Sequence, residues 1–188
     1  GLLATVAAGP HVPFAVDADS ADLVLLVDGA TLSLGQAGAV QNSVDQSRRL
    51  FPLTAGETLG DVDFAPAFDL GALATAAQLQ GLGQTLLDVT TDYAKQRKQF
   101  GKPIGQFQAI KHHLAEVAVG LEMSRPLLHG AALAVRDGSA DSSRDVSAAK
   151  VACGDAAYRA ARARCRYTAP SGTPRSTTCR CGSPRSGH

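Results

Sequence analysis

The sequence predicts an α+β chain that is mainly α, in which a partial β domain precedes an antiparallel up-down helical bundle. Two observations predict this class. Short apolar runs bounded by turn residues occupy the chain up to about residue 65, and from Pro66 onward the apolar residues recur at helical spacing. Of the 188 residues, 45% are hydrophobic, which is enough to bury a core. We therefore expect a partial β domain over 1–65, a helical bundle domain over 66–164 and a disordered basic tail over 165–188.

The first region has the signals of strands and turns. Apolar runs at 12–16 and 23–27 predict strands, Asp28-Gly29 predicts a turn, and alternation continues from there through Leu34. Because this region is short for an independent sheet domain, we expect it to be part of a larger β domain.

A first helix is predicted over about 67–98. Leu82, Leu86, Val89 and Tyr93 follow the spacing i, i+4, i+7, i+11, which places them on one face. Glycine and proline residues at 101–105 then end the helical pattern.

A second helix is predicted to end near Val135. Its stripe alternates steps of three and four, a spacing that packs helices nearly antiparallel. The stripe comprises Phe107, Ile110, Leu114, Val117, Leu121, Ser124 and Leu128. Pro126 lies inside this helix, removes one backbone hydrogen bond and should bend it.

A third helix is predicted to begin near Ser142 or Ser143, either of which can cap it, and to end at about Ala163. Its apolar face comprises Val146, Ala149, Cys153 and Ala156.

Charge divides the chain into two parts. Residues 1–158 carry 11 basic and 17 acidic residues, a net charge of −6, whereas residues 159–188 carry seven arginines and no acid. After Arg166 no apolar period remains, which predicts a disordered tail.

Composition also argues against several classes of protein. No run approaches the roughly 20 apolar residues of a membrane span, and the N-terminus lacks the basic start of a secretory signal. With 13 Arg against five Lys, the usage is typical of GC-rich DNA, so we expect a cytoplasmic protein of a GC-rich bacterium. The four cysteines do not form the two CxxC pairs of a zinc ribbon, and no metal site is predicted.

The most informative stretch reads YAKQRKQFGKPIGQFQAIKHHLAEVA, from Tyr93 to Ala118. It combines a helix end that carries an arginine, a tight Gly/Pro connection and a second helix whose free N–H groups could meet an anion. The basic cluster in it is interrupted by glycine and proline, so a phosphate-bearing cofactor explains it better than nucleic acid does. The residues alone leave simpler interpretations open. Arg97 could be a cation at a helix C-terminus, Phe100 and Phe107 could be core residues, and Gln108 could be a polar group at a helix end.

This stretch resembles the C-terminal helical domain of the acyl-CoA dehydrogenase family, and the likeness covers about Pro66 to Ala163. Residues 14–18, 22–25 and 45–49 look like the end of that family's middle β domain. The resemblance therefore implies a fragment with part of the β domain and three of the four bundle helices.

The resemblance implies a flavoprotein of lipid catabolism that uses FAD to oxidise an acyl-CoA thioester to its 2-enoyl form. It also implies a homo- or hetero-oligomer that passes electrons to an electron-transferring flavoprotein. Position by position, Arg97 would pair with the FAD pyrophosphate across a subunit interface, Gln99 and Phe100 would lie beside the cofactor, and Phe107 and Gln108 would contact its adenosine half. An arginine suits this role because its planar fork binds phosphate oxygens bidentately.

The resemblance assigns fewer residues to the substrate site than to the cofactor site. Asp69 matches a position near the CoA-thioester site, but the start of the first helix has Gly71 and Ala72 where some members carry the catalytic carboxylate. The catalytic residue is therefore unassigned, and we expect the chain to be inactive alone. Two alternatives are a non-catalytic partner subunit that completes the FAD site of a heteromeric enzyme, and a damaged reading frame without function.

The tail departs from the family. It reads CRYTAPSGTPRSTTCRCGSPRSGH, where the family has a Gly-rich segment and a fourth helix. Back-translation one base out of step permits VQVHGAIGYTAEHDLSLWLTKVRA, which is the sequence that the family would lead one to expect. We therefore hypothesise a one-base slip of the reading frame near Ala163 or Arg164.

Overall fold

The structure is a computed structural model that describes residues 1–45 and 47–168. The chain divides into two compact units between Ala65 and Pro66, and each is described by itself. Within the described residues, no helix has both the length and the apolar character that crossing a bilayer requires.

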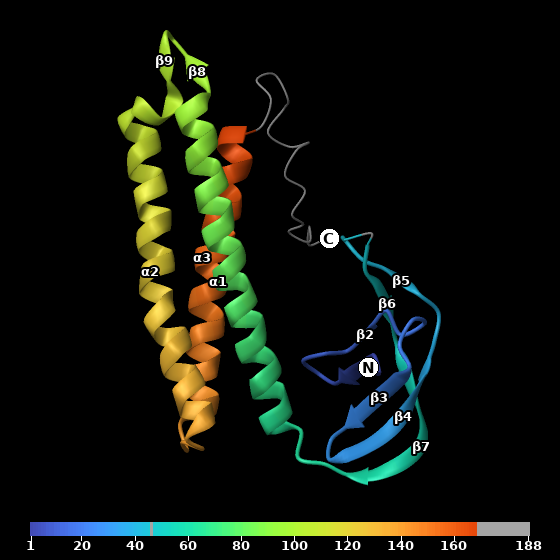
Figure 1. The fold of residues 1–188 in the computed structure, drawn as a ribbon. Helices are drawn as coiled ribbons and strands as arrows, with labels where there is room; N and C mark the ends of the chain where they lie inside the picture. The colour runs from blue at the N-terminus through green and yellow to red at the C-terminus, as the bar shows by residue number, and fades with distance from the viewer. Residues whose placement is uncertain (46, 169–188) are drawn as a thin grey trace, which may run out of the picture. The chain divides into compact units, whose positions relative to one another are not determined.

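The first unit is built on a four-stranded sheet with the strand order β1-β3-β4-β7 (Figure 1). Its strands are β1 (Ala4–Ala8), β3 (Leu23–Asp28), β4 (Thr31–Ala37) and β7 (Leu53–Asp61). β1 is parallel to β3, whereas β4 is antiparallel to both β3 and β7. A second sheet has the order β2-β6-β5, with β2 (Ala15–Val16), β6 (Arg49–Phe51) and β5 (Gln41–Asn42). Small side chains and one ring form the core of the unit: Ala7, Ala15, Ala18 and Phe51.

The predicted hairpin is present between β3 and β4, with its turn at Gly29-Ala30, one residue later than predicted. Gly29 has a φ of 59°, a left-handed conformation that glycine adopts at little cost. The sequence patterns missed β1, which is rich in alanine, and β7, which contains Gly56 and Gly60 and pairs with β4 through register shifts. These strands depend on pairing with neighbours rather than on their own β propensity.

The second unit is an antiparallel bundle of three helices, α1 (Ala65–Gln96), α2 (Gln108–Arg136) and α3 (Ser142–Thr168) (Figure 1). A two-stranded hairpin of β8 (Lys98–Gln99) and β9 (Lys102–Pro103) and the 3-10 helix η1 (Ile104–Gln106) join α1 to α2. The end of α1, the hairpin, the start of α2 and the end of α3 therefore lie at one end of the bundle.

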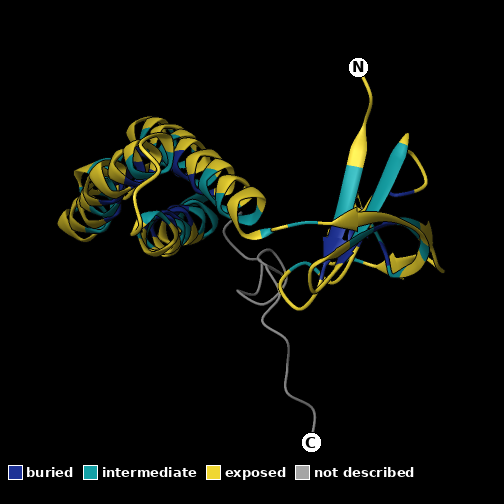
Figure 2. Cartoon of the chain, turned by 90° about the horizontal axis from the view of Figure 1, so that it is seen from below, coloured by how far each residue is buried: buried dark blue, intermediate teal, exposed yellow. Residues whose placement is uncertain are grey.

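The buried faces of α2 and α3 are the predicted ones. The buried residues of the bundle show as dark blue patches where its helices face one another (Figure 2). On α2 the buried stripe comprises Val117, Leu121, Ser124, Leu128 and Ala131; on α3 it comprises Val146, Ala149, Cys153, Ala156, Ala157, Ala160 and Ala163. Helix α2 continues through Pro126, and the bend expected there stays a prediction.

The centre of the buried face of α1 lies one residue further along than predicted, although Leu86 of the predicted face packs against the core. The helix buries Ala76, Gln80, Gly83, Thr90 and Ala94, whereas Leu82 and Val89 are 52% and 44% exposed. Close packing selects the face with small residues, since a Cβ at Gly83 would lie 3.2 Å from the Cα of Ala157. Periodicity alone could not choose between two adjacent stripes on the same helix.

A buried polar contact joins α1 to α2. Gln80 Nε2 donates to the carbonyl of Leu121 at 2.9 Å, and Ser124 Oγ donates to Gln80 Oε1 at 2.7 Å. Because a buried polar group left without a partner costs about 1–3 kcal/mol, this contact favours one alignment of the two helices.

Helix α3 begins at Ser142, as predicted, and differs from the prediction at its other end. At its start, the carbonyl of Asp141 accepts the first helical bond from the Asp145 N–H at 3.0 Å, while the Ser143 side chain donates to Asp69. At its end the helix continues to Thr168, so the expected disorder is wrong for 165–168. Tyr167, four residues after Ala163, extends the apolar face and packs on the core, which stabilises another turn. The rest of the tail, 169–188, lies outside the described residues.

Candidate functional site

The hairpin between α1 and α2 holds an aromatic residue in a strained conformation. Gln99 pairs with Lys102, so Phe100 and Gly101 form a two-residue turn, with φ values of 52° and 78°. Two consecutive positive φ angles are typical of a type I′ turn, in which a residue with a bulky side chain is unfavourable. Phe100 is nevertheless 92% exposed. A strained and exposed aromatic ring is a feature of binding sites rather than of cores.

The hairpin is fixed against both helices. The Ile104 N–H donates to the carbonyl of Arg97 at 2.8 Å, and the Arg97 N–H donates to the carbonyl of Tyr93 at 2.9 Å. Gly105 permits this closeness, because a Cβ there would lie 3.1 Å from the carbonyl oxygen of Ala94. The backbone around Arg97 is therefore fixed, while its guanidinium projects from the end of α1.

Aromatic and cationic groups meet beside the turn. The rings of Phe100 and Phe107 contact edge to face with centroids 6.3 Å apart, and Lys102 Nζ lies 4.6 Å from the centroid of Phe107. Such contacts are worth about 0.5–1 kcal/mol at an exposed site, and they hold a positive charge over an aromatic surface.

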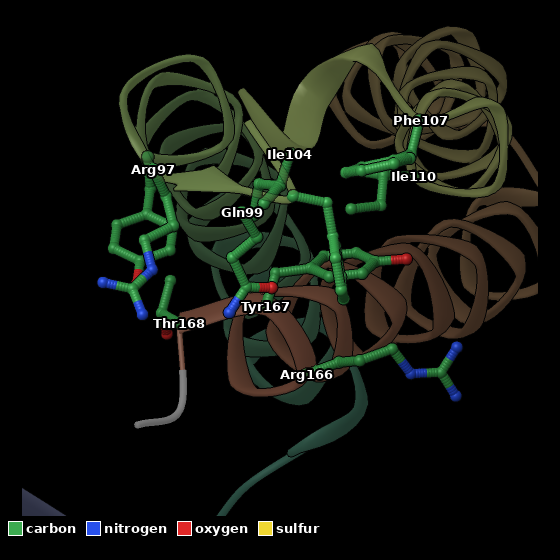
Figure 3. Close-up of a pocket in the computed structure, with 10 residues that line it drawn as sticks. Arg97, Gln99, Ile104, Phe107, Ile110, Arg166, Tyr167 and Thr168 are labelled. Carbon is green, nitrogen blue, oxygen red and sulfur yellow. The ribbon is translucent and has the colours of Figure 1, made fainter. Parts of the chain in front are cut away.

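These residues surround an open hollow of about 670 Å³ at the end of the bundle (Figure 3). It is lined by Tyr93, Arg97, Gln99, Phe100, Ile104, Phe107, Ile110, Arg166, Tyr167 and Thr168. Among the residues that the structure describes, the lining contains two arginines and no carboxylate. Within residues 1–45 and 47–168, Arg97 forms no ion pair, so its guanidinium is available for an anion.

Four of the five residues predicted to contact a cofactor line this hollow: Arg97, Gln99, Phe100 and Phe107. Gln108, at the first residue of α2, is exposed and lies outside the lining. Asp69 is near the other end of α1, where its Oδ1 accepts from Ser143 Oγ at 3.1 Å. At 1.5 Å per residue, the 28 positions from Asp69 to Arg97 span about 42 Å, so one chain does not bring the two together.

The sequence patterns missed the contribution of α3. Tyr167 contacts His113 edge to face with ring centroids 5.6 Å apart, and Arg166 and Thr168 lie beside it in the hollow. The Thr168 hydroxyl donates to the carbonyl of Arg164 at 2.8 Å. The only signal for these residues was their spacing of one helical turn from Ala163.

Comparison with known proteins identifies the family to which the chain belongs. The profile of the family described as "Acyl-CoA dehydrogenase, C-terminal domain" matches residues 64–172, which is more than half of the 188-residue chain. The chain belongs to the acyl-CoA dehydrogenase family. The matched residues of this family member include the hairpin, the hollow and all three helices.

Among relatives, the acyl-CoA dehydrogenase IpdE2 of Mycolicibacterium smegmatis is 36% identical over 129 residues, which cover 68% of this chain and 41% of the relative. The solved butyryl-CoA dehydrogenase from Megasphaera elsdenii matches with a TM-score of 0.73 at 22% identity, over 92% of this chain and 55% of that one. The ChsE4-ChsE5 complex from Mycobacterium tuberculosis matches with a TM-score of 0.69 at 24% identity, over 93% of this chain and 54% of that one. This acyl-CoA dehydrogenase family member thus shares the fold of these structures and spans about half of their length.

Proposed function

We propose that the chain is part of an FAD-dependent acyl-CoA dehydrogenase, an oxidoreductase that introduces an α,β double bond into an acyl-CoA thioester. The observation that carries the proposal is the hollow. Arg97, Gln99, Phe100 and Phe107 come from one sequence motif that contains a strained turn, and they line one surface there. Within residues 1–45 and 47–168, no carboxylate pairs with Arg97.

The lining fits the adenosine diphosphate half of FAD. Arg97 would bind the pyrophosphate, which needs a cation with parallel N–H donors, and Phe107 with Gln108 would contact the adenosine half. A carboxylate in the lining would repel a diphosphate, and none of the described lining residues is acidic. When bound, FAD supplies the acceptor for the hydride that leaves the β-carbon of the substrate.

The remaining residues would position the cofactor and exclude water. Gln99 and Phe100 would lie beside it, Phe100 being held outward by its turn. Lys102, above the ring of Phe107, adds a second positive charge near the phosphates. Because the backbone of Arg97 is fixed by hydrogen bonds of its N–H and its carbonyl, only the side chain of Arg97 would have to be ordered on binding.

The substrate side would be built by the other end of α1, where Asp69 is proposed to lie near the CoA thioester. Gly71 and Ala72 follow it on α1, and neither can abstract the α-proton. We propose that this chain does not supply the base and is inactive alone. Electrons from the reduced flavin would pass to an electron-transferring flavoprotein.

The missing carboxylate favours a second candidate, a non-catalytic partner subunit that completes the FAD site of another chain. A heteromeric assembly would place the motif of this chain against a subunit that carries the base. One of the solved structures that share this fold is itself a complex of two different proteins, ChsE4 and ChsE5.

The purified 188-residue chain distinguishes these candidates. Flavin absorbance in the visible range that is bleached by acyl-CoA supports the self-sufficient enzyme. Flavin binding only after mixing with a homologous subunit supports the partner-subunit role. A colourless, aggregated product under both conditions would contradict both and favour a damaged reading frame without function.

A further inference from the structure

We infer that the outer face of α2 is a contact surface at which two copies of this chain pair through antiparallel α2 helices. The centre of this face, which we call the outer stripe, comprises Val119, Met123 and Leu127. Their side chains are 61%, 70% and 48% exposed. Single exposed apolar residues are ordinary, but a row of them on one face is typical of a surface that another molecule covers.

The outer stripe lies across α2 from the core of the bundle. Successive residues of a helix are rotated by about 100°, so Val119 and Leu127 lie about 40° to either side of Met123. The buried residues Leu121 and Leu128 point about 160° and about 140° away from Met123. Both α1 and α3 pack on these buried residues, so the outer stripe faces away from the two helices.

The middle of α2 has few charges on either side. Residues 117–134 contain only two charged side chains, Glu122 and Arg125. A surface helix carries charged and polar residues opposite its core face, whereas a helix that is apolar all round is buried. The outer face of α3 is an ordinary surface, because the exposed Val151 shares it with Asp155 and Arg162. The outer stripe of α2 is therefore expected to be covered in the assembled protein.

The fourth helix that the resemblance implies would not cover the outer stripe. In an up-down bundle of four helices, the fourth lies beside the first and the third. A helix laid on the outer stripe would contact α2 alone, and it would leave Leu82 and Val89 of α1 half-exposed. The outer stripe therefore requires an occupant from outside the bundle.

Two charges on one flank of the outer stripe favour a second copy of α2 as the occupant. Glu122 and Arg125 pair with each other at 3.2 Å, and both side chains are exposed. In an antiparallel pair whose two-fold axis passes near Met123, Val119 of each copy meets Leu127 of the other. The same symmetry brings Glu122 of each copy beside Arg125 of the other, which gives two ion pairs between the copies. A parallel pair would set this flank against the opposite, uncharged flank and form neither ion pair.

The pairing surface is separate from the hollow at the hairpin end. Met123 lies 15 positions after Gln108, the first residue of α2, which corresponds to about 22 Å along the helix. One helix pair is smaller than a standard interface of about 1,600 Å². We therefore expect a dimer that dissociates at micromolar concentration, whether or not a cofactor is bound.

The experiment is sedimentation equilibrium of the full chain from about 1 μM to about 1 mM. The variant Met123→Glu places a charge at the centre of the outer stripe, where pairing would bury it. The matched control is Val151→Glu, which adds the same charge at a position of α3 that is 65% exposed, against 70% for Met123. We expect Met123→Glu to weaken dimerisation at least about tenfold and Val151→Glu to change it less than about twofold. Circular dichroism checks that both variants keep the helical content of the chain.

Charge reversal tests the antiparallel arrangement. Glu122→Arg and Arg125→Glu each give the flank a single sign, so like charges meet and each variant alone should dimerise about fivefold more weakly. An equimolar mixture of the two variants restores opposite charges across the interface, although neither chain regains its internal ion pair. We expect the mixture to dimerise within about twofold of the unaltered chain.

Three results would overturn the inference. A chain that stays monomeric over the whole concentration range has no such interface. Equal effects of Met123→Glu and Val151→Glu would place the association elsewhere on the chain. A mixture of the two charge variants that dimerises no more tightly than each variant alone would rule out the antiparallel pair.

Discussion

At the scale of single residues, the strained turn at Phe100 links local conformation to function. A left-handed conformation costs a residue other than glycine about 1–2 kcal/mol, and Phe100 has a φ of 52° with its ring exposed. A protein selected for stability alone would have asparagine or glycine at this position. Retaining phenylalanine implies that its ring has a role outside the fold.

Replacing Phe100 should therefore trade function for stability. We expect Phe100→Asn, which creates a favourable Asn-Gly turn, to stabilise the chain by roughly 0.5–1 kcal/mol in thermal unfolding and to weaken flavin binding. Phe100→Leu keeps the strain and removes the ring, so it should weaken flavin binding without the gain in stability. Unchanged flavin binding in both variants would show that the ring is not a cofactor contact.

Cys153 gives a prediction about pH. The residue is fully buried on α3, and burial raises the pKa of its thiol, an effect only partly offset by a hydrogen bond with Ser124. Above the ordinary thiol pKa of about 8.5, the unfolded chain loses this proton while the folded chain retains it. The free energy of unfolding should therefore be independent of this thiol below that pH and should fall as the pH rises above it.

The measurement is chemical denaturation across the alkaline range, for the chain and for Cys153→Ala. The variant should show a shallower decline, and the difference between the two curves isolates Cys153 from the other titrating groups. Parallel declines would mean that the thiol ionises equally easily in the folded state.

At the scale of elements, small residues determine how closely the helices approach. A Cβ at Gly83 would lie 2.6 Å from Leu121 Cδ2 and 3.2 Å from the Cα of Ala157. Gly81, two residues earlier on the same helix, has no atom within 4 Å of such a Cβ. Substitutions at Gly81 and Gly83 therefore separate the effect of helix propensity on stability from the effect of packing.

We expect Gly81→Ala to stabilise the chain by about 0.5–1 kcal/mol, because alanine is the better helix former. Gly83→Ala gains the same propensity but overpacks the interface, which typically costs about 1–3 kcal/mol, so it should be less stable than Gly81→Ala. Urea denaturation of the two variants gives the comparison. Equal stabilisation would mean that α1 moves away from α3 without cost.

The exposed stripe of α1 also belongs to this scale. Leu82 and Val89 are apolar and half-exposed, beside the small residues that the bundle buries. The family resemblance implies a fourth helix. Such a helix would bury apolar surface, and burial stabilises the fold by about 25 cal/mol for each Å² of apolar area removed from water. The sequence pattern identified a real apolar stripe on α1, of which α2 and α3 cover Leu86 and leave Leu82 and Val89 largely exposed.

At the scale of the whole molecule, the hypothesis of a reading-frame slip concerns the end of α3 and the tail. The family profile matches residues up to 172, and α3 is built through Thr168, both beyond the proposed slip near Ala163 or Arg164. Residues 165–168 therefore pack on the bundle as they stand. The slip of the reading frame, which would replace residues 165–188, stays a hypothesis.

Sequencing the gene's DNA tests it. We expect a single-base shift near these codons to restore a peptide close to VQVHGAIGYTAEHDLSLWLTKVRA, and a chain with that restored tail to be more resistant to urea than this one. If no single-base shift yields a family-like tail, the slip did not occur.

The sequence by itself determined the helical bundle, the buried faces of α2 and α3 and the motif around Arg97. The helices and their faces follow from the local spacing of apolar residues, and the motif is a continuous stretch of sequence. Only the tertiary structure decided which stripe of α1 is buried, where α3 ends and that Arg166 and Tyr167 share a hollow with Arg97. The physical reason is that these outcomes depend on contacts between residues far apart in the chain. At Gly83 the close approach of α3 determines which side of α1 is buried. At Tyr167 the packing of one ring on the core adds a turn to α3, although composition alone assigns that segment to a tail.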